Sequence, residues 1–331
     1  MRLIFVADVH LGAYREFNVN GSRLERCFDA MRQVLATAVA HGVSHVIDCG
    51  DLIDRKNLID LTTYNRIFRF FRDEVQPTGI PYTALAGNHN ISGVSGETNL
   101  LPLTEFITEV KQPSTLALDG VTLHLIPFYR NEDDWMVAYH NAQRNAAPGR
   151  NILVGHQEIK GAVTGTHRYV AGGGLDRSKV TFFDHCIFGH YHQFQVWGDN
   201  MQVFYAGALL QQDFGEINNS QGFWIYDTDT GVWQWYQVEV PRFLVTDDPL
   251  STDDYNYWNV NTDQSFTPVN HDDHVRVSTT PLAKEVDRLS ASGNIDQMIE
   301  AYLSEKAPPQ HLDLLRHILK EVSNEHEPTS D

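Results

Sequence analysis

The chain has 331 residues, of which 42% are hydrophobic and 21% are charged, a composition that excludes an intrinsically disordered protein. Its formal net charge of −18 excludes a protein that holds nucleic acid by bulk electrostatic attraction alone, although bound cations and local basic loops can reverse the field at a site. The three cysteines form no CxxC pair, which favours a reducing compartment. Because the sequence has neither a signal-peptide pattern nor an apolar run long enough to span a membrane, we expect a soluble, cytoplasmic protein with no membrane association.

The first ninety or so residues alternate short apolar runs with amphipathic segments. The apolar runs predict buried strands, and apolar residues spaced three and four apart predict helices. The predicted strands are 2–7, 43–48 and 81–86, and the predicted helices are 22–41 and 61–75. This β-α-β-α-β order favours parallel strands joined by right-handed crossovers.

The second half is richer in strands. We expect a hairpin at 222–240 and another turn at Gly198-Asp199-Asn200. Further strands are predicted at 121–126, 151–154, 185–188, 193–198 and 201–206. Together with the first half, these strands predict an α/β fold in which a β-sandwich carries helices on its outer faces.

The pattern weakens beyond residue 240. We predict a main domain at 1–240, a linker or small cap at 241–280, and a helical segment with a disordered tail at 281–331. The two helices of the last segment are expected at 282–304 and 309–322. The second of these carries an apolar stripe that is too hydrophobic to stay exposed, so it binds a partner or packs on the chain's own core.

Five of the predicted strands end in turns that carry metal-binding residue types. In α/β sheets, sites form at the carboxyl ends of the strands, so the five turns should converge. The turns contain Asp8-Val9-His10, Gly50-Asp51-Leu52-Ile53-Asp54, Gly87-Asn88-His89-Asn90, Gly155-His156 and Gly189-His190-Tyr191-His192. Each motif alone would be an ordinary polar loop, but five in this order predict a single site.

The residue types suit a pair of divalent cations. Imidazole and carboxylate ligands together fit manganese, iron or zinc. Asp8 and His10 are two residues apart, as are His190 and His192, so each pair can face one way from a strand. Asp51 is the candidate bridging carboxylate for two ions about 3.5–4 Å apart, and Asn88 offers a neutral carbonyl oxygen.

These motifs resemble the calcineurin-like metallophosphoesterase superfamily, whose signature is DxH, GDxx, GNH, a lone histidine and GHxH. Within it the chain is most similar to the nuclease subunits of the SbcD (meiotic-recombination-eleven) group, in particular the phage recombination endonuclease branch. The similarity runs from residue 1 to about 240 and includes GHQEIKGAVTG at 155–165 and QGFWIYDTDTG at 221–231. It implies a four-layer α-β-β-α metallophosphoesterase sandwich as the catalytic domain, with a small cap region and C-terminal helices.

The resemblance also implies roles for the site residues. One metal would be held by Asp8, His10, Asp51 and His192, and the other by Asp51, Asn88, His156 and His190. The ions would be Mn²⁺, with Mg²⁺, Fe²⁺ or Zn²⁺ as alternatives. His89 would be the general acid or a transition-state stabiliser. Asp54 and Asn90 would support the ligands, although the family usually has an acidic residue where this chain has Asn90 and often a histidine where it has Asp54.

The implied activity is that of a two-metal-dependent DNA exonuclease or endonuclease in recombination, repair or replication. Its implied partners are DNA, an SbcC-type coiled-coil ATPase that docks on 281–331, and a second copy of the chain in a homodimer. The alternative is a protein or small-molecule phosphatase or phosphodiesterase of the same superfamily. The segment Gly50–Lys56 imitates the phosphatase pattern GDxVDRG, but Lys56 replaces its last glycine.

Because the whole chain is acidic, DNA contacts must come from local basic residues. The candidates lie in loops just past the predicted metal ligands, where they could contact phosphates beside the site. They are Arg15, Arg23, Arg55, Lys56, Lys160, His167 and Arg168. The alternative for each is a solvated surface charge.

Overall fold

The computed structural model describes residues 1–12, 14, 17–18, 21–54, 59–92, 97–164, 169–253, 255–261 and 274–278. The chain divides into two compact units, the first made of Met1–Val245, Thr252–Asn259 and Pro268–Arg276, and the second of Thr246–Ser251, Val260–Thr267 and Val277–Asp331. The helices predicted at 282–304 and 309–322 lie outside the described residues. The predicted domain boundaries at 240 and 280 stay predictions.

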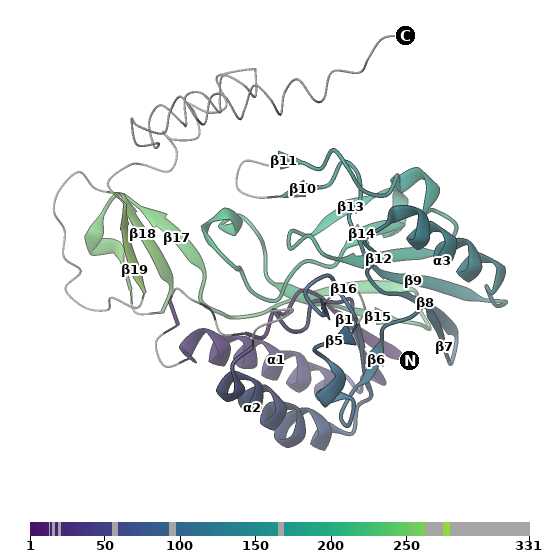
Figure 1. The fold of residues 1–331 in the computed structure, drawn as a ribbon, viewed down its shortest axis with the longest axis horizontal. Coiled ribbons are helices and arrows are strands. Elements are labelled where there is room, and N and C mark those ends of the chain that lie inside the picture. The colour runs from purple at the N-terminus through teal and green to yellow at the C-terminus, as the bar shows by residue number, and fades with distance from the viewer. Residues whose placement is uncertain are drawn as a thin grey trace, which may run out of the picture. The chain divides into compact units, whose positions relative to one another are not determined.

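The first of two six-stranded sheets has the strand order β16-β15-β1-β2-β3-β6. Figure 1 labels four of its strands, β1, β6, β15 and β16. The strands β1, β2, β3 and β6 are parallel, whereas β15 and β16 are antiparallel additions at one edge. Their bounds are β1 (Arg2–Val6), β2 (His45–Asp48), β3 (Tyr82–Leu85), β6 (Thr108–Val110), β15 (Gly222–Asp227) and β16 (Val232–Gln237). The predicted parallel core and the hairpin at 222–240 are confirmed.

The second six-stranded sheet has the order β13-β14-β12-β9-β8-β7. Its four inner strands are parallel, and the edge strands β13 and β7 are antiparallel to their neighbours. The bounds are β7 (Ser114–Leu118), β8 (Val121–Ile126), β9 (Arg150–His156), β12 (His185–Gly189), β13 (Gln195–Trp197) and β14 (Val203–Tyr205). A 3₁₀ turn at Asp199–Met201 joins β13 to β14, where the sequence predicted a hairpin turn.

The described residues contain three α-helices, α1 (Ser22–Ala40), α2 (Leu61–Phe70) and α3 (Glu132–Arg144). The helix predicted at 61–75 continues past α2 as a π-helical turn at Phe71–Val75. The sequence analysis did not predict α3, because only Trp135, Ala138 and Tyr139 of this helix are buried and such a short stripe gives a weak helical period. Asn131 caps α3 by accepting a hydrogen bond from the Asp133 amide (2.8 Å).

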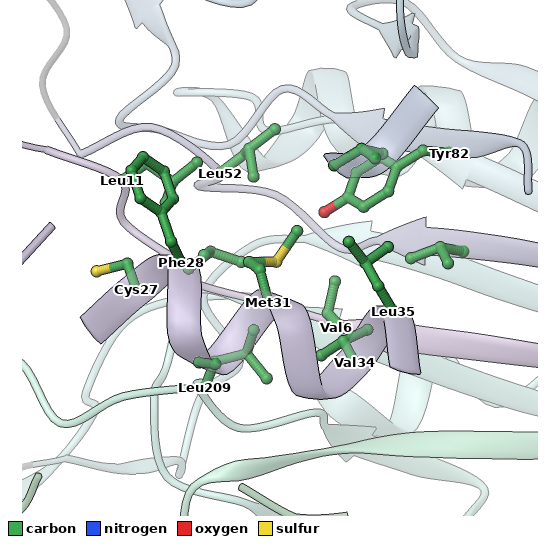
Figure 2. Packing of buried hydrophobic residues seen from close by; sticks show 14 of the residues in the cluster. Val6, Leu11, Cys27, Phe28, Met31, Val34, Leu35, Leu52, Tyr82 and Leu209 are labelled. Carbon is green, nitrogen blue, oxygen red and sulfur yellow. The ribbon is translucent and has the colours of Figure 1, made fainter. Parts of the chain in front are cut away.

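Three apolar clusters separate four layers. The first lies between α1, α2 and the first sheet, and Figure 2 shows its residues Phe28, Met31 and Leu35 on α1. Phe28 and Phe70 stack in this cluster with ring centroids 4.5 Å apart. The second lies between the two sheets and the third between the second sheet and α3. The alternation along β1 creates this arrangement, because Ile4 and Val6 face the helices while Leu3 and Phe5 face the other sheet. The expected α/β fold is confirmed, and the structure shows that both of its six-stranded sheets are mixed.

Several short strands lie outside the two six-stranded sheets. They are β4 (Ile91–Ser92), β5 (Glu97–Thr98), β10 (Val163–Thr164), β11 (Tyr169–Val170), β17 (Phe243–Thr246), β18 (Tyr257–Asn261) and β19 (Val275–Ser278). The last three form a sheet that the sequence analysis did not predict within 241–280. No helix in the described ranges is both long enough and apolar enough to cross a bilayer.

Candidate metal centre

The turns that carry the predicted ligands have an unusual backbone. Asp8, His10, Asp51 and His190 all have positive φ angles, at 51°, 52°, 60° and 110°. Non-glycine residues in this region cost of order 1–3 kcal/mol each and persist only where the surroundings hold them. Gly50, with φ of 113°, leaves no room for a side chain, since a Cβ there would lie 2.3 Å from the Nδ1 of His156. The loops are therefore held in a strained shape that aims their side chains at one place.

One group of potential ligands consists of Asp8, His10 and His192, whose ligand atoms lie within 4.8 Å of one another. The Nε2 atoms of the two histidines are 3.2 Å apart. Their other ring nitrogens face carboxylates: His10 Nδ1 is 3.3 Å from Asp54 Oδ1, and His192 Nδ1 is 2.5 Å from Glu216 Oε1. Because each Nδ1 donates its hydrogen to a carboxylate, the facing Nε2 atoms need a proton or a metal cation between them.

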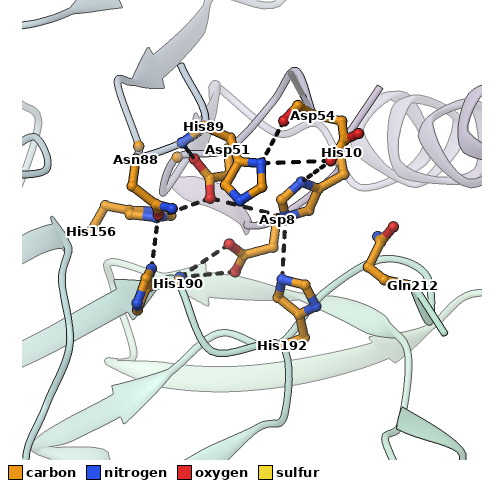
Figure 3. Close-up of polar contacts among 12 residues, drawn as sticks. Asp8, His10, Asp51, Asp54, Asn88, His89, His156, His190, His192 and Gln212 are labelled. Carbon is orange, nitrogen blue, oxygen red and sulfur yellow. Dashed lines mark hydrogen bonds and ion pairs between the residues drawn. The ribbon is translucent and has the colours of Figure 1, made fainter. Parts of the chain in front are cut away.

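A second group consists of Asp51, His156 and His190, again within 4.8 Å. His156 donates from Nδ1 to the Cys49 carbonyl (2.9 Å), so its Nε2 turns toward Asp51 Oδ2 at 3.2 Å and Asn88 Oδ1 at 3.0 Å. His190 Nδ1 lies 2.8 Å from the same Asn88 oxygen. Oxygen and nitrogen lone pairs thus converge on this position as they do on the first (Figure 3).

Asp51 lies between the two groups. Its Oδ2 atom, 3.2 Å from His156 Nε2, is also 4.0 Å from His10 Nε2. Asp8 approaches the second group as well, since both of its carboxylate oxygens accept the His190 backbone N–H at 3.1 Å. These carboxylate, amide and imidazole donors match a dinuclear centre for hard to borderline divalent cations.

The buried carboxylates of the centre favour positive charge on two of its histidines. Burial opposes a charge on His156, yet Asp51 raises the pKa of this imidazole to about 9. Burial likewise opposes the charge on His192, but Glu216 raises its pKa to about 10. The pKa of Asp51 is held well below its usual range by His156, although burial works against this. Burial, followed by the charge of His156, lowers the pKa of His190 to about 3. The protons retained by His156 and His192 stand where cations would supply the same charge, whereas the lowered pKa leaves His190 neutral, the form that ligates a metal.

His89 lies at the rim of the centre, with 38% of its side chain exposed. Its Nδ1 contacts the Asp54 carbonyl oxygen and lies 3.6 Å from Asp54 Oδ1, and its backbone N–H donates to Asp51 Oδ1 (2.8 Å). The hydrogen bond to Asp54 raises the pKa of His89. His10, Asp54 and His89 also form a third group of potential ligands that shares His10 with the first.

Asn90 is fully buried and ties two ligand loops together. Its side-chain oxygen accepts hydrogen bonds from the amides of Asp51 and Gly87, both at 3.0 Å. Its side-chain nitrogen donates to the Ile53 carbonyl at 3.2 Å and to Asn99 Oδ1 at 3.1 Å. A carboxylate at this position could not make the two donations. The side chain of Asn90 therefore fixes the backbone around Asp51, and the polar contacts of the His89 ring come from Asp54.

Comparison with known proteins agrees with this geometry. The family model of the calcineurin-like phosphoesterases matches residues 1–194, which is more than half of the chain. The chain belongs to this family.

Two curated relatives of this phosphoesterase are themselves named as nuclease components. Over 239 residues, or 70% of the chain, it is 24% identical to exonuclease subunit 1 of Enterobacteria phage T4. Over 264 residues, or 69% of the chain, it is 25% identical to the SbcD component of nuclease SbcCD from Staphylococcus epidermidis. The chain spans 66% of the length of each of these relatives.

Solved structures with a similar fold include two phosphatases. A purple acid phosphatase from yellow lupin matches 72% of the phosphoesterase and 52% of its own length, with 14% identity and a TM-score of 0.45. A dimetal phosphatase from Danio rerio matches 68% of the phosphoesterase and 91% of its own length, with 12% identity and a TM-score of 0.41.

Most of the basic residues predicted to contact DNA lie outside the part of the phosphoesterase that the structure describes; these are Arg15, Arg55, Lys56, His167 and Arg168. Lys160 is described and is exposed just past β9. Arg23 is only 2% exposed, and its guanidinium donates to the Gln211 carbonyl (3.1 Å) and lies over the Tyr14 ring (4.6 Å). In this position Arg23 cannot reach a phosphate, so we leave it out of the proposed DNA contacts.

The sequence analysis missed Glu216 of the phosphoesterase. Besides facing His192, its carboxylate accepts the Gln212 backbone N–H at 2.9 Å. Its side chain is 14% exposed and belongs to a 3₁₀ turn at Phe214–Glu216. The only sequence signal was a carboxylate in a short polar segment after β14, with no motif spacing to connect it to His192.

Proposed function

We propose that the chain is a two-metal-dependent DNA nuclease that hydrolyses phosphodiester bonds as an exonuclease, an endonuclease or both, in recombination, repair or replication. The observation that carries the proposal is the position of Asp51 Oδ2 between the two ligand groups, 3.2 Å from His156 Nε2 and 4.0 Å from His10 Nε2. A carboxylate shared in this way can bridge two cations. The names of both curated relatives support a nuclease over other phosphoesterases.

In this proposal each cation has four protein ligands. The first is held by Asp8, His10, Asp51 and His192, and the second by Asp51, Asn88, His156 and His190. Manganese is the proposed ion, with Mg²⁺, Fe²⁺ or Zn²⁺ as alternatives, since the donors suit any of them. When bound, such a pair neutralises the charge on the phosphodiester and activates a water molecule for attack.

His89 is the proposed general acid. It is the most exposed histidine of the centre, and its Nδ1 faces Asp54, so Nε2 is the atom that can give a proton to the departing sugar oxygen. General acids of this kind contribute typically 10²–10⁴-fold to the rate. Asp54 orients the rings of His10 and His89, and Asn90 fixes the loop of Asp51.

The proposed partners extend beyond DNA. One relative is by its name a component of an SbcCD nuclease, which supports an SbcC-type coiled-coil ATPase as the partner of this chain. We assign its docking to 281–331 and keep a homodimer as part of the proposal. Removing 281–331 should abolish ATPase association and leave a metal-loaded phosphoesterase. Lys160, together with Arg15, Arg55, Lys56 and Arg168, is proposed to contact DNA phosphates.

The test compares metal binding with substrate choice. Calorimetric titration of the metal-free protein with Mn²⁺ should give two ions per chain, and the Asp51→Asn variant should lose at least one. With Mn²⁺ the wild type should cleave linear DNA much faster than a phosphomonoester. His140→Ala is the control, because His140 is exposed on α3 and bonds only to Gln143 within the described residues. Preferred hydrolysis of the phosphomonoester would reject the nuclease assignment and favour a phosphatase.

A further inference from the structure

A pocket lies next to the segment that carries His192. It has a volume of about 380 Å³, which is within the size range of small-molecule sites, and its six lining residues are uncharged. They are Gln193, Phe194, Asn218, Ser220, Trp224 and Trp235. The three aromatic rings form a cluster, with the Trp224 centroid 5.0 Å from both Phe194 and Trp235.

Two independent features of the chain place lining residues of this pocket near the metal centre. Gln193 and Phe194 directly follow His192, so the Phe194 and His192 Cα atoms are at most roughly 7 Å apart. On the other sheet, Trp224 pairs with Phe5 across β15 and β1, and Trp235 pairs with Trp224 across β16. Phe5 is three residues before Asp8, so their Cα atoms are at most roughly 10 Å apart. Phe194 therefore lies close to one proposed ligand, and Trp224 lies beside the end of β1 that leads to another.

The buried part of the cluster has a structural role. Trp224 is 7% exposed, and its indole N–H donates to the Ala206 carbonyl at 3.1 Å, so this ring closes the core between the sheets. Phe194 and Trp235 are only partly buried, and Asn218 and Ser220 are exposed. Within the described residues, the side chains of Gln193, Asn218 and Ser220 make no hydrogen bond. A ligand in this pocket would thus contact aromatic rings in its interior. At the rim it would find amide and hydroxyl groups that are available for hydrogen bonds.

We propose that this pocket takes one unpaired nucleobase of the strand whose phosphodiester lies at the metal centre. The proposal rests on the proposed nuclease function and names its substrate as DNA with at least one unpaired nucleotide next to the scissile bond. A base is uncharged, stacks on aromatic rings and presents donors and acceptors at its edge, as the lining residues require. The phosphate carries the negative charge and would bind at the metal centre. The pocket would therefore bind the base, and the metal centre the phosphate, of the same strand.

The experiment combines a protein variant with a substrate variant. Binding of a short single-stranded oligonucleotide with hydrolysis-resistant phosphorothioate linkages is measured by fluorescence anisotropy in Mn²⁺, with one abasic residue moved along the strand. In the wild type, one position should weaken binding by about 5- to 150-fold, the range for loss of one base–aromatic stack. Trp235→Ala should bind the intact strand more weakly than the wild type by the same factor. It should bind that abasic strand with the same affinity as the wild type does. Trp235→Phe, which keeps a ring, should recover most of the affinity.

Trp197→Ala is the matched control, because Trp197 lies on β13 just past Phe194 but does not line the pocket. It should bind every strand as the wild type does. Two results would overturn the pocket assignment and leave the proposed function standing. In the first, an abasic residue does not weaken binding to the wild type at any position. In the second, the fold-losses in affinity from Trp235→Ala and from the abasic residue multiply, which would show that they act independently. If the wild type neither binds nor cleaves DNA, the proposed function fails and the pocket assignment fails with it.

Discussion

Replacing Glu216 by glutamine should weaken metal binding without unfolding the chain. Glu216 holds the Nδ1 of His192 at 2.5 Å, so it sets the direction of the proposed ligand atom Nε2 and increases its basicity. Glutamine keeps the size of the side chain and can still accept the Gln212 amide that Glu216 accepts at 2.9 Å, but it removes the charge. Loss of such a carboxylate partner typically weakens metal affinity 10- to 100-fold, which corresponds to about 1.4–2.7 kcal/mol.

The assay is calorimetric titration of metal-free protein with Mn²⁺, alongside thermal unfolding in the absence of metal. In Glu216→Gln two ions should still bind, one of them 10- to 100-fold more weakly. Glu158→Gln is the matched control, because Glu158 faces His190 at 3.4 Å and its side chain is 47% exposed, so solvent screens the contact and the affinity should change little. If Glu216→Gln lowered the unfolding temperature and bound both ions like the wild type, the carboxylate would have only a structural role and the reasoning would be wrong.

Three further substitutions test neighbouring parts of the centre. His89→Ala should keep two Mn²⁺ ions and lower kcat on DNA by about 10²–10⁴-fold, as measured by single-turnover cleavage; loss of an ion instead would make His89 a ligand. Asn90→Asp should lose the donations to the Ile53 carbonyl and Asn99 and destabilise the fold by about 1–3 kcal/mol in urea unfolding, whereas an unchanged midpoint would contradict the loop-tying role. Gly50→Ala should abolish metal binding, because the new methyl group would displace the His156 ring and the φ of 113° is strained for alanine; titration with Mn²⁺ checks this, and normal binding would show that the loop can relax.

The sequence predicted those parts of the fold that depend on local pattern. The strands β1, β2 and β3 are short, buried and largely apolar runs, and each of them is followed by a turn whose side chains reach the centre, so local pattern identified the elements and the candidate ligands. Other features depend on contacts between distant segments. Glu216 reaches His192 across 24 residues, and no local pattern marks that contact.

The predicted DNA contact at Arg23 illustrates the same limit. A basic residue just past a candidate ligand turn looks exposed in the sequence, but Arg23 lies under Tyr14 and donates to Gln211, which is 188 residues away. The helix α3 was missed for a different reason, because its buried face is too narrow to produce a clear period. The pocket residues Trp224 and Trp235 lie on β15 and β16, whereas Phe194 lies just before β13, so these three residues meet only in the folded chain.

The division of the proposed ligands between the two sheets has a mechanical consequence. Asp8, His10, Asp51 and Asn88 follow strands of the first sheet, while His156, His190 and His192 belong to the ends of β9 and β12 in the second. A cation bound by both sets would cross-link the two sheets of the sandwich at the end where the ligand-bearing loops lie. Sliding of one sheet against the other would then have to break coordination bonds, so metal loading should make the two halves unfold as a single cooperative body.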